Sequence, residues 1–364
     1  MAGKAARRAE GFPWHGGILD EFGNMDPKVF EEVLRPALAE TGGWCWFIGV
    51  PEGRNHYYKL HRNAQAQAQA RAYLLAGRME EAAAILRTAY GDSSATLLAG
   101  GLAGLEWDAF TWKSADILPA KEIEAARRDM AADLFEQEFE ARFTAFRGRV
   151  YKPFRQETHC APITHRYNPK APLVVCLDFN VEPGSAVICQ ELELPCGNPG
   201  TAVIGEVHIE YDSTTEAVCR KIADDWEGHQ GPLILHGDAT GGQRRTQASE
   251  AGSTDWKIAK QILRSRFPRV VDKVPKENPA VRDRVNHLNA RIQNAAGDIR
   301  LQVDPMHAPK TVEDLEGVRW LPGTSEIAKT GKTNMGLTHW TDSLGCYVSE
   351  RWPIRDHSAS GIKR

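Results

Sequence analysis

The chain has 364 residues, of which 42% are hydrophobic and 26% charged, and its formal net charge at pH 7 is −3. This composition is typical of a globular protein with one or two domains. The absence of any run of about 18 apolar residues argues against a membrane span, and the basic N-terminus lacks the apolar segment of a signal peptide. The small net charge excludes a uniformly basic protein, so nucleic-acid contacts would have to come from local patches.

The seven cysteines are odd in number and form no CxxC pair, and several lie inside apolar runs, such as Cys176 in LVVCLDF. Structural zinc sites and disulfide frameworks show different patterns. We therefore expect reduced thiols in a cytoplasmic protein.

Residues 1–60 predict a small α/β unit. The runs ILDEF and WCWFIGV read as strands, and DPKVFEEVLRPALAE between them reads as a helix. A strand, a helix and a strand in this order imply parallel pairing. The apolar run that ends in Asp20 and Glu21 looks like the Walker B strand of a P-loop ATPase.

Residues 61–118 are Ala-rich and low in complexity, and we interpret them as a helical insertion. Residues 119–165 follow with a strong helical period, which predicts linker helices between two domains.

Residues 166–352 carry the densest pattern. Three β-rich runs, PLVVCLDFN, GSAVICQEL and TAVIGEVHIEY, are separated by Pro and Gly turns, and strands then alternate with helices up to THWTDSLGCYVSERW. An antiparallel meander followed by such alternation is the order of a ribonuclease H-like α/β fold with a mixed sheet. We expect residues 353–364 to be a disordered tail.

Three aspartates in this segment are candidates for catalysis and metal binding. Asp178 and Asp238 end two apolar strands, and Asp342 lies near the start of the last helix, where Gly345 leaves room beside it. In the expected topology the first and fourth strands are neighbours, so the two strand ends would meet. Converging carboxylates need cations between them, and hard oxygen ligands suit Mg²⁺ or Mn²⁺. Two such ions can activate a water and stabilise the leaving oxygen of a phosphodiester.

These stretches resemble the large terminase subunit of tailed bacteriophages. The matching segments are LDFN, GDATGGQRRT, NPAVRDRVNHLNARI, VEDLEGVRW and LTHWTDSLGCY, and the likeness extends upstream to EIEAARRDMAADLFEQEFEARF, GILDEF and FIGVPEGRNHYYKL. The resemblance implies that Asp178, Asp238 and Asp342 bind the metals of the nuclease. It also implies that residues 1–60 correspond to part of the ATPase motor.

The motor part departs from the family pattern. A Walker A loop, G-x-x-x-x-G-K-[ST], holds the phosphates in such motors, and none precedes Asp20 in this sequence. The triplet Gly331-Lys332-Thr333 follows Walker B and has Glu326 in place of the first glycine, so we interpret it as a loop. Asp20 and Glu21 are then an ATPase remnant, or half of a site that a longer or split protein would complete, and ATPase activity is not expected of this chain alone.

DNA contact is expected through basic residues near the aspartates, although a solvated helix surface is the alternative. The candidates are Arg244, Arg245, Lys273 and Lys276, together with Arg282, Arg284 and Arg291, which we expect on the polar side of a helix at 279–293. We interpret His236 and His339, which lie close to Asp238 and Asp342 in sequence, as structural residues. Glu206 on the third strand could face the site, but we favour a surface position on an alternating strand.

The main hypothesis is a metal-dependent endonuclease that cuts concatemeric viral DNA within a packaging complex, with double-stranded DNA, portal protein and small terminase subunit as partners. Two alternatives stay open at this point. One is a part of an ATP-driven packaging translocase, and the other is a non-catalytic docking module.

Overall fold

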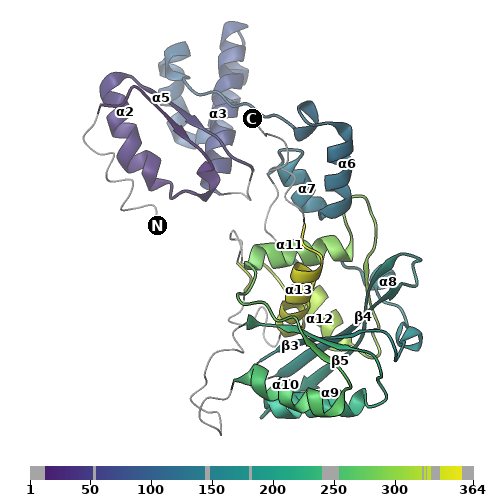
Figure 1. The fold of residues 1–364 in the computed structure, drawn as a ribbon. Helices are drawn as coiled ribbons and strands as arrows, with labels where there is room; N and C mark the ends of the chain where they lie inside the picture. The colour runs from purple at the N-terminus through teal and green to yellow at the C-terminus, as the bar shows by residue number, and fades with distance from the viewer. Residues whose placement is uncertain are drawn as a thin grey trace. The chain divides into compact units, whose positions relative to one another are not determined.

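The computed structural model describes residues 13–51, 55–143, 148–179, 183–239, 254–321, 324, 326–328 and 337–354. The chain divides into two compact units (Figure 1), the first made of Met1–Pro119 with Glu136–Ala145 and the second of Ala120–Phe135 with Phe146–Arg364. The segment 119–165, expected as a linker, thus contributes to both units.

The first unit begins with the predicted α/β element. Strand β1 (Gly16–Leu19) pairs in parallel with β2 (Trp44–Phe47). The connection runs through the short helix η2 (Phe22–Asn24), the π-helical turn η3 (Val29–Leu34) and α2 (Arg35–Thr41). Its small core contains the buried residues Leu19, Phe22, Phe30 and Leu38.

The predicted helical segment follows in the same unit. Its elements are α3 (His56–Leu75), α4 (Met79–Tyr90), η4 (Gly91–Ser93), α5 (Ser94–Ala99), η5 (Gly101–Gly104) and η6 (Ser114–Asp116). They enclose a second small core of Ala70, Ala82, Leu86 and Leu105. Alanine dominates where α3 and α4 pack because its small side chain lets helices approach closely.

The second unit is built on one mixed sheet in the order β7-β6-β3-β4-β5-β8. Strands β3, β4 and β5 form the predicted antiparallel meander, and the pairs β3–β6, β6–β7 and β5–β8 are parallel. The strands are β3 (Leu173–Asp178), β4 (Gly184–Glu193), β5 (Pro199–Ile209), β6 (Leu233–Gly237), β7 (Val270–Asp272) and β8 (Leu301–Val303).

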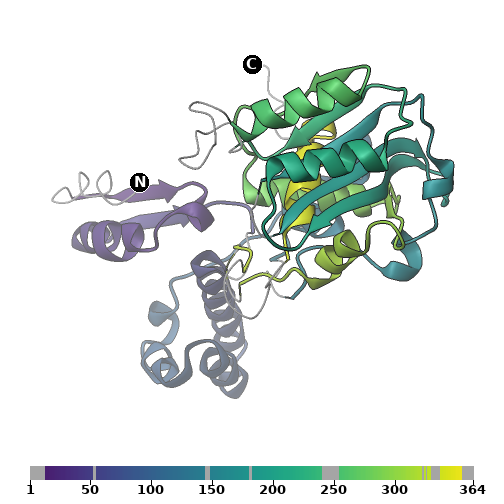
Figure 2. The ribbon, with the colours of Figure 1, turned by 90° about the horizontal axis from the view of Figure 1, so that it is seen from below.

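Helices cover both faces of this sheet, as Figure 2 shows. One face packs on α9 (Thr215–Asp225) and α10 (Asp255–Arg266), and the other packs on α11 (Val281–Ile292), α12 (Pro309–Gly317) and α13 (His339–Arg351). Strand β3 is apolar up to Asp178 because Val174 and Cys176 face the second group while Val175 and Leu177 face the first. The unit also contains α6 (Ala120–Asp129), α8 (Gln156–His159) and η7 (Thr164–Arg166), and α7 (Ala132–Glu138) passes from this unit into the first.

Several expectations fall outside the described residues: Arg244, Arg245, the triplet 331–333, and the tail from residue 355 onward. All seven cysteines are described and are free thiols, with Cys176, Cys189, Cys219 and Cys346 buried and Cys196 exposed. Within the described part of the chain, every helix is too short or too polar to cross a membrane.

Candidate functional site

Asp178 and Asp238 lie at the ends of two neighbouring strands, as the sequence predicted. In the parallel pair β3–β6, Leu177 is opposite Gly237, and the next residue on each strand is the aspartate. The backbone N–H of Asp238 donates to the Leu177 carbonyl over 3.3 Å. Gly237 has a φ of 149°, and a Cβ there would come 2.1 Å from the Leu177 oxygen, so only glycine permits this close approach.

Helix α13 brings Asp342 to the same end of the sheet. The helix packs against β3 and β6. His339, one turn before Asp342, has its Nδ1 atom 3.1 Å from Asp178 Oδ2. This hydrogen bond with Asp178 raises the pKa of His339 above its ordinary value, against the effect of burial, and the charges of Asp314 and Asp342 act in the same direction. The imidazole of His339, paired with Asp178, is therefore part of the site.

The other two carboxylates also have protein partners. Asn278 Nδ2 donates to Asp238 Oδ1 over 2.7 Å, and Arg284 Nη2 donates to Asp342 Oδ1 over 2.7 Å. Among the residues that the structure describes, no group of three or more His, Cys, Asp or Glu side chains is gathered closely enough to hold a metal ion as it stands. The donor chemistry still fits a hard divalent cation, because two carboxylates end adjacent strands and a third lies on the covering helix.

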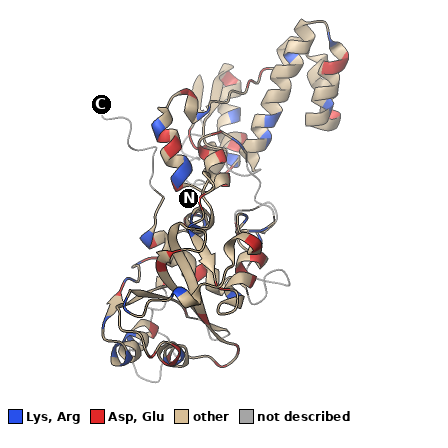
Figure 3. Cartoon of the chain, turned by 90° about the vertical axis from the view of Figure 1, so that its right-hand side faces the viewer, with Lys and Arg blue, Asp and Glu red and all other residues tan. Residues whose placement is uncertain are grey.

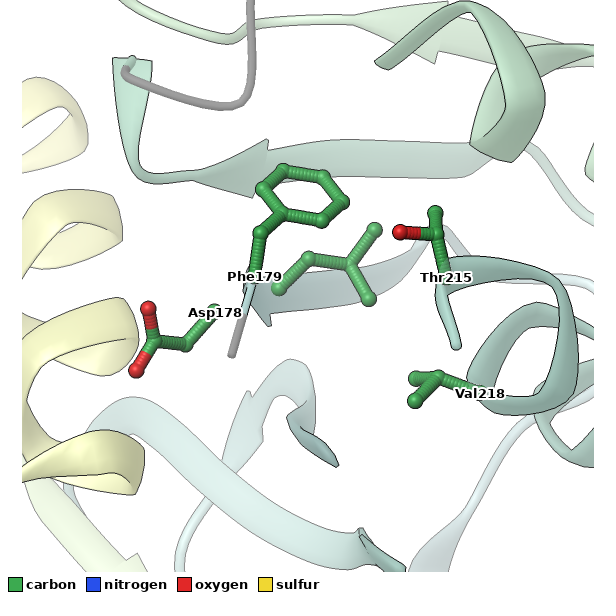
Figure 4. Close-up of a pocket in the computed structure, with 5 residues that line it drawn as sticks. Asp178, Phe179, Thr215 and Val218 are labelled. Carbon is green, nitrogen blue, oxygen red and sulfur yellow. The ribbon is translucent and has the colours of Figure 1, made fainter. Parts of the chain in front are cut away.

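Figure 4 shows which way the Asp178 carboxylate points. A small pocket beside the strand end is lined by Leu177, Asp178, Phe179, Thr215 and Val218. The carboxylate points away from Thr215 and Val218 and toward α13, drawn in yellow. Chemistry at Asp178 would therefore take place on the α13 side of the strand end, outside the mostly apolar pocket.

The start of α13 is fixed by a carboxylate from α12. Asp314 is fully buried and accepts hydrogen bonds from the backbone N–H groups of Thr338, Trp340 and Thr341 over 3.0–3.1 Å. Burial raises the pKa of Asp314 to about 7, while these backbone donors favour its ionised form.

A carboxylate from β5 fixes the start of α12 in a similar way. Glu206 accepts from the backbone N–H groups of Lys310 and Thr311, each over 2.8 Å. The expectation that Glu206 is a surface residue is wrong, because it is half-buried at the first turn of α12. Its carboxylate satisfies helix N–H groups that have no partner within the helix.

Two of the arginines expected to contact DNA are buried instead. Arg284 and Arg291 are each 7% exposed, so their expected place on a polar helix surface is wrong. Arg291 Nη2 lies 2.8 Å from Glu191 Oε2, and its guanidinium lies 4.2 Å from the centroid of the Trp352 ring. Both arginines precede a residue of the apolar stripe by one position, which places them at its border, opposite carboxylates on neighbouring elements.

The remaining basic candidates differ in exposure. Lys273 and Lys276 are exposed, and Arg282 is half-buried, with burial lowering its pKa. Figure 3 shows Lys and Arg interspersed with Asp and Glu along the elements of both units. A basic path for DNA is therefore not evident from the described elements alone.

Of the two histidines set aside from the sequence, one lies in the site. His236 is buried, its ring centroid lies 4.8 Å from that of Tyr347, and burial lowers its pKa to about 4, which fits a structural residue. His339 instead contacts Asp178. Its spacing of three from Asp342 on one helix was a usable signal, whereas nothing in the local sequence indicated Asn278.

In the first unit, Asp20 and Glu21 follow β1 and are exposed. The segment after β2 lies beside them, since the N–H of Phe22 donates to the Ile48 carbonyl over 3.0 Å. Asn55 accepts from the N–H of Tyr58 at the start of α3 and donates to the Gly23 carbonyl. The two carboxylates thus lie on a loop that is tied to the first turn of a long helix.

Comparisons with known proteins find the same fold in phage large terminases. The large terminase of a thermophilic bacteriophage in complex with ADP has a TM-score of 0.54 at 14% identity, over 95% of this chain and 71% of that one. The same phage protein in complex with ATP-gamma-S has a TM-score of 0.53 at 15% identity, over 93% and 71%.

The nuclease domain of the bacteriophage SPP1 large terminase with bound Mn matches 54% of this chain and 94% of that one at 16% identity, with a TM-score of 0.33. No protein-family model and no curated protein matches the sequence. The chain is therefore similar in fold to the large terminases.

Proposed function

We propose that this chain, whose fold is that of the phage large terminases, acts in phage DNA packaging as a metal-dependent endonuclease on double-stranded DNA. The observation that carries the proposal is the parallel pairing of β3 with β6, which sets Asp178 and Asp238 side by side while α13 brings Asp342 to the same strand ends. Aspartates that only form turns or cap helices at the surface are not expected to lie together at the ends of three different elements.

The topology of the second unit supports a ribonuclease H-like domain. Without β8, the sheet order is β7-β6-β3-β4-β5, so the first strand of the meander lies in the centre and the fourth pairs with it in parallel. The sequence pattern predicted that the first and fourth strands of this domain would be neighbours. We propose residues 166–352 as the nuclease domain.

The chemistry proposed here needs one or two divalent cations, Mg²⁺ or Mn²⁺, with Asp178, Asp238 and Asp342 as ligands. A cation held there would polarise the scissile phosphate and offset its charge. The chain's own residues orient the ligands: His339 holds Asp178, Asn278 holds Asp238 and Arg284 holds Asp342. A protonated His339 would also attract the phosphate backbone.

DNA contact is proposed to depend on the phosphate backbone and therefore on salt concentration. The described candidates are the exposed Lys273 and Lys276, which follow β7, and Arg282 in the first turn of α11, with Arg244 and Arg245 as proposals from sequence. Portal protein and small terminase subunit are proposed as further partners. We also propose that Asp20 and Glu21 belong to an ATPase remnant and that the chain alone does not turn over ATP.

The test is cleavage of supercoiled plasmid by the purified chain with Mn²⁺ or Mg²⁺, measured as conversion to nicked and linear forms. We expect Asp178→Asn and Asp342→Asn to reduce the rate by at least about 100-fold, since even the outer partners of metal ligands contribute about 10–100-fold. EDTA should abolish cleavage.

A matched control is Asp225→Asn, which removes a carboxylate of the same unit that pairs with Lys221 at the surface of α9. It should cleave like the unaltered chain. DNA binding without cleavage at any metal concentration would favour a docking module. Phosphate release from ATP, measured in parallel, would instead favour the motor hypothesis.

A further inference from the structure

Arg284 occupies the space beside Asp342. It lies on α11 with its side chain 8% exposed, against 14% for the Asp342 side chain, and the two are joined by the 2.7 Å contact of Nη2 with Oδ1. Nη1 lies 3.9 Å from Cys346 Sγ. Within the described part of the chain, the buried Nε atom has no acceptor, so Asp342 is the strongest partner of this cation.

Gly345 makes this arrangement possible. A Cβ at position 345 would lie 2.5 Å from Arg284 Cγ and 3.0 Å from Cδ, which is too close for any residue larger than glycine. Glycine inside a helix costs about 1 kcal/mol relative to alanine. The room that the sequence indicated beside Asp342 is therefore filled by an arginine of the neighbouring helix.

The charge of Arg284 affects what Asp342 can bind. The guanidinium lies at hydrogen-bond distance from the Asp342 carboxylate and offsets its negative charge. A divalent cation would draw on the same negative charge and would be repelled by the guanidinium.

We propose that Arg284 is a positioning residue that neutralises Asp342 and competes with a divalent cation for it. In this arrangement Asp342 can bind a divalent cation only when Arg284 releases it. The inference rests on the proposed metal-dependent function and deepens it, because it names a residue that limits the affinity of the site for its cation.

The test compares thermal unfolding of the full chain with and without Mn²⁺ for the unaltered chain and for Arg284→Gln. Removal of the guanidinium should raise the affinity of Asp342 for Mn²⁺, because the two cations no longer compete for one carboxylate. A ligand that binds only the folded state raises its stability in proportion to the logarithm of this affinity. The rise in melting temperature on adding Mn²⁺ should thus be larger for Arg284→Gln.

Arg291→Gln is the matched control, because it removes an equally buried arginine of the same helix. Its partner Glu191 lies six residues farther along β4 than Ser185, which pairs with Asp178. Its Mn²⁺-dependent rise should equal that of the unaltered chain. An equal rise in all three proteins would overturn the inference.

If Arg284→Gln does not fold, Gly345→Ala tests the same point, since the added methyl group pushes Arg284 off its position. It should show the larger rise, and an unchanged rise would overturn the inference. The two proposals fail in different ways. Cleavage by the unaltered chain with equal Mn²⁺ effects in every variant would refute only the role of Arg284, whereas no Mn²⁺ effect in any protein would refute both.

Discussion

Asp304 shows how a single buried carboxylate ties two distant segments together. It follows β8, is 2% exposed, and accepts hydrogen bonds from the N–H groups of Ile163 and Thr164 over 2.8 and 2.9 Å and from the Thr164 hydroxyl over 2.8 Å. Burial alone would raise its pKa, but these donors and His307 hold the pKa of Asp304 well below its ordinary value. The ionised carboxylate is thus the form that the fold prefers.

Asp304→Asn should lower the free energy of unfolding by about 3 kcal/mol at pH 7, because hydrogen bonds to a charged group contribute about 1.5–3 kcal/mol each and the amide can replace only part of them. A depressed pKa stabilises the fold above the ordinary value of 3.8, and this stabilisation is lost as the pH falls below it. The difference between the two proteins should shrink from pH 4 downward in urea unfolding. A difference that stays constant to pH 3 would contradict this explanation, and Asp224→Asn, at an exposed pair with Arg266, should change stability by less than about 0.5 kcal/mol.

At the scale of elements, the position of α13 depends on its first turn. Thr338 precedes the helix with a φ of 88°, a costly conformation for a β-branched residue, and Asp314 accepts its backbone N–H. Glu206 fixes α12, α12 carries Asp314, and Asp314 fixes α13. Two carboxylates, Glu206 and Asp314, therefore connect β5 through α12 to the helix that bears His339 and Asp342.

Asp314→Asn should disturb the catalytic end of α13 more than the rest of the unit. The amide group directs N–H donors at backbone N–H groups that need an acceptor, and each unsatisfied buried donor costs about 1–3 kcal/mol. We expect amide hydrogen exchange at Trp340 and Thr341 to accelerate by at least about tenfold, with plasmid cleavage reduced. Glu313→Gln, which alters an exposed neighbour on α12 paired with Lys310, serves as the control. Unchanged exchange in Asp314→Asn would show that the helix start does not need this carboxylate.

The elements themselves could be predicted from sequence, because apolar runs and helical periods report burial locally. Three β-rich runs of residues 166–352, separated by Pro and Gly turns, predicted β3, β4 and β5, and the expected pairing of the first and fourth strands placed Asp178 beside Asp238. Contacts between distant residues could not be predicted in this way. A helical period cannot distinguish the exposed side of α11 from the border of its apolar stripe, so the burial of Arg284 and Arg291 was missed. Their partners Asp342 and Glu191 lie on α13 and β4, and the sequence alone does not show that these elements pack near the two arginines of α11.

At the scale of the whole molecule, the two units have separate cores. In the first unit, Leu86 is fully buried among the helices α3–α5, and in the second, Leu288 is fully buried between α11 and the sheet. Among the described residues, the two cores of the first unit are small, with four fully or nearly buried members each. Because a small core stabilises little, the first unit should unfold at the lower temperature.

Differential scanning calorimetry of the full chain should therefore show two transitions. Leu86→Ala should lower only the first and Leu288→Ala only the second, because truncating a buried leucine costs about 2–5 kcal/mol within the unit that contains it. Each variant is the control for the other, since the chemical change is the same and only the unit differs. If either substitution moved both transitions together, the two units would unfold as one cooperative unit. In that case, the Mn²⁺-dependent rise in melting temperature would also appear in the first transition. If the units unfold independently, Mn²⁺ should raise only the temperature of the second transition, because Arg284 and the three aspartates belong to the second unit.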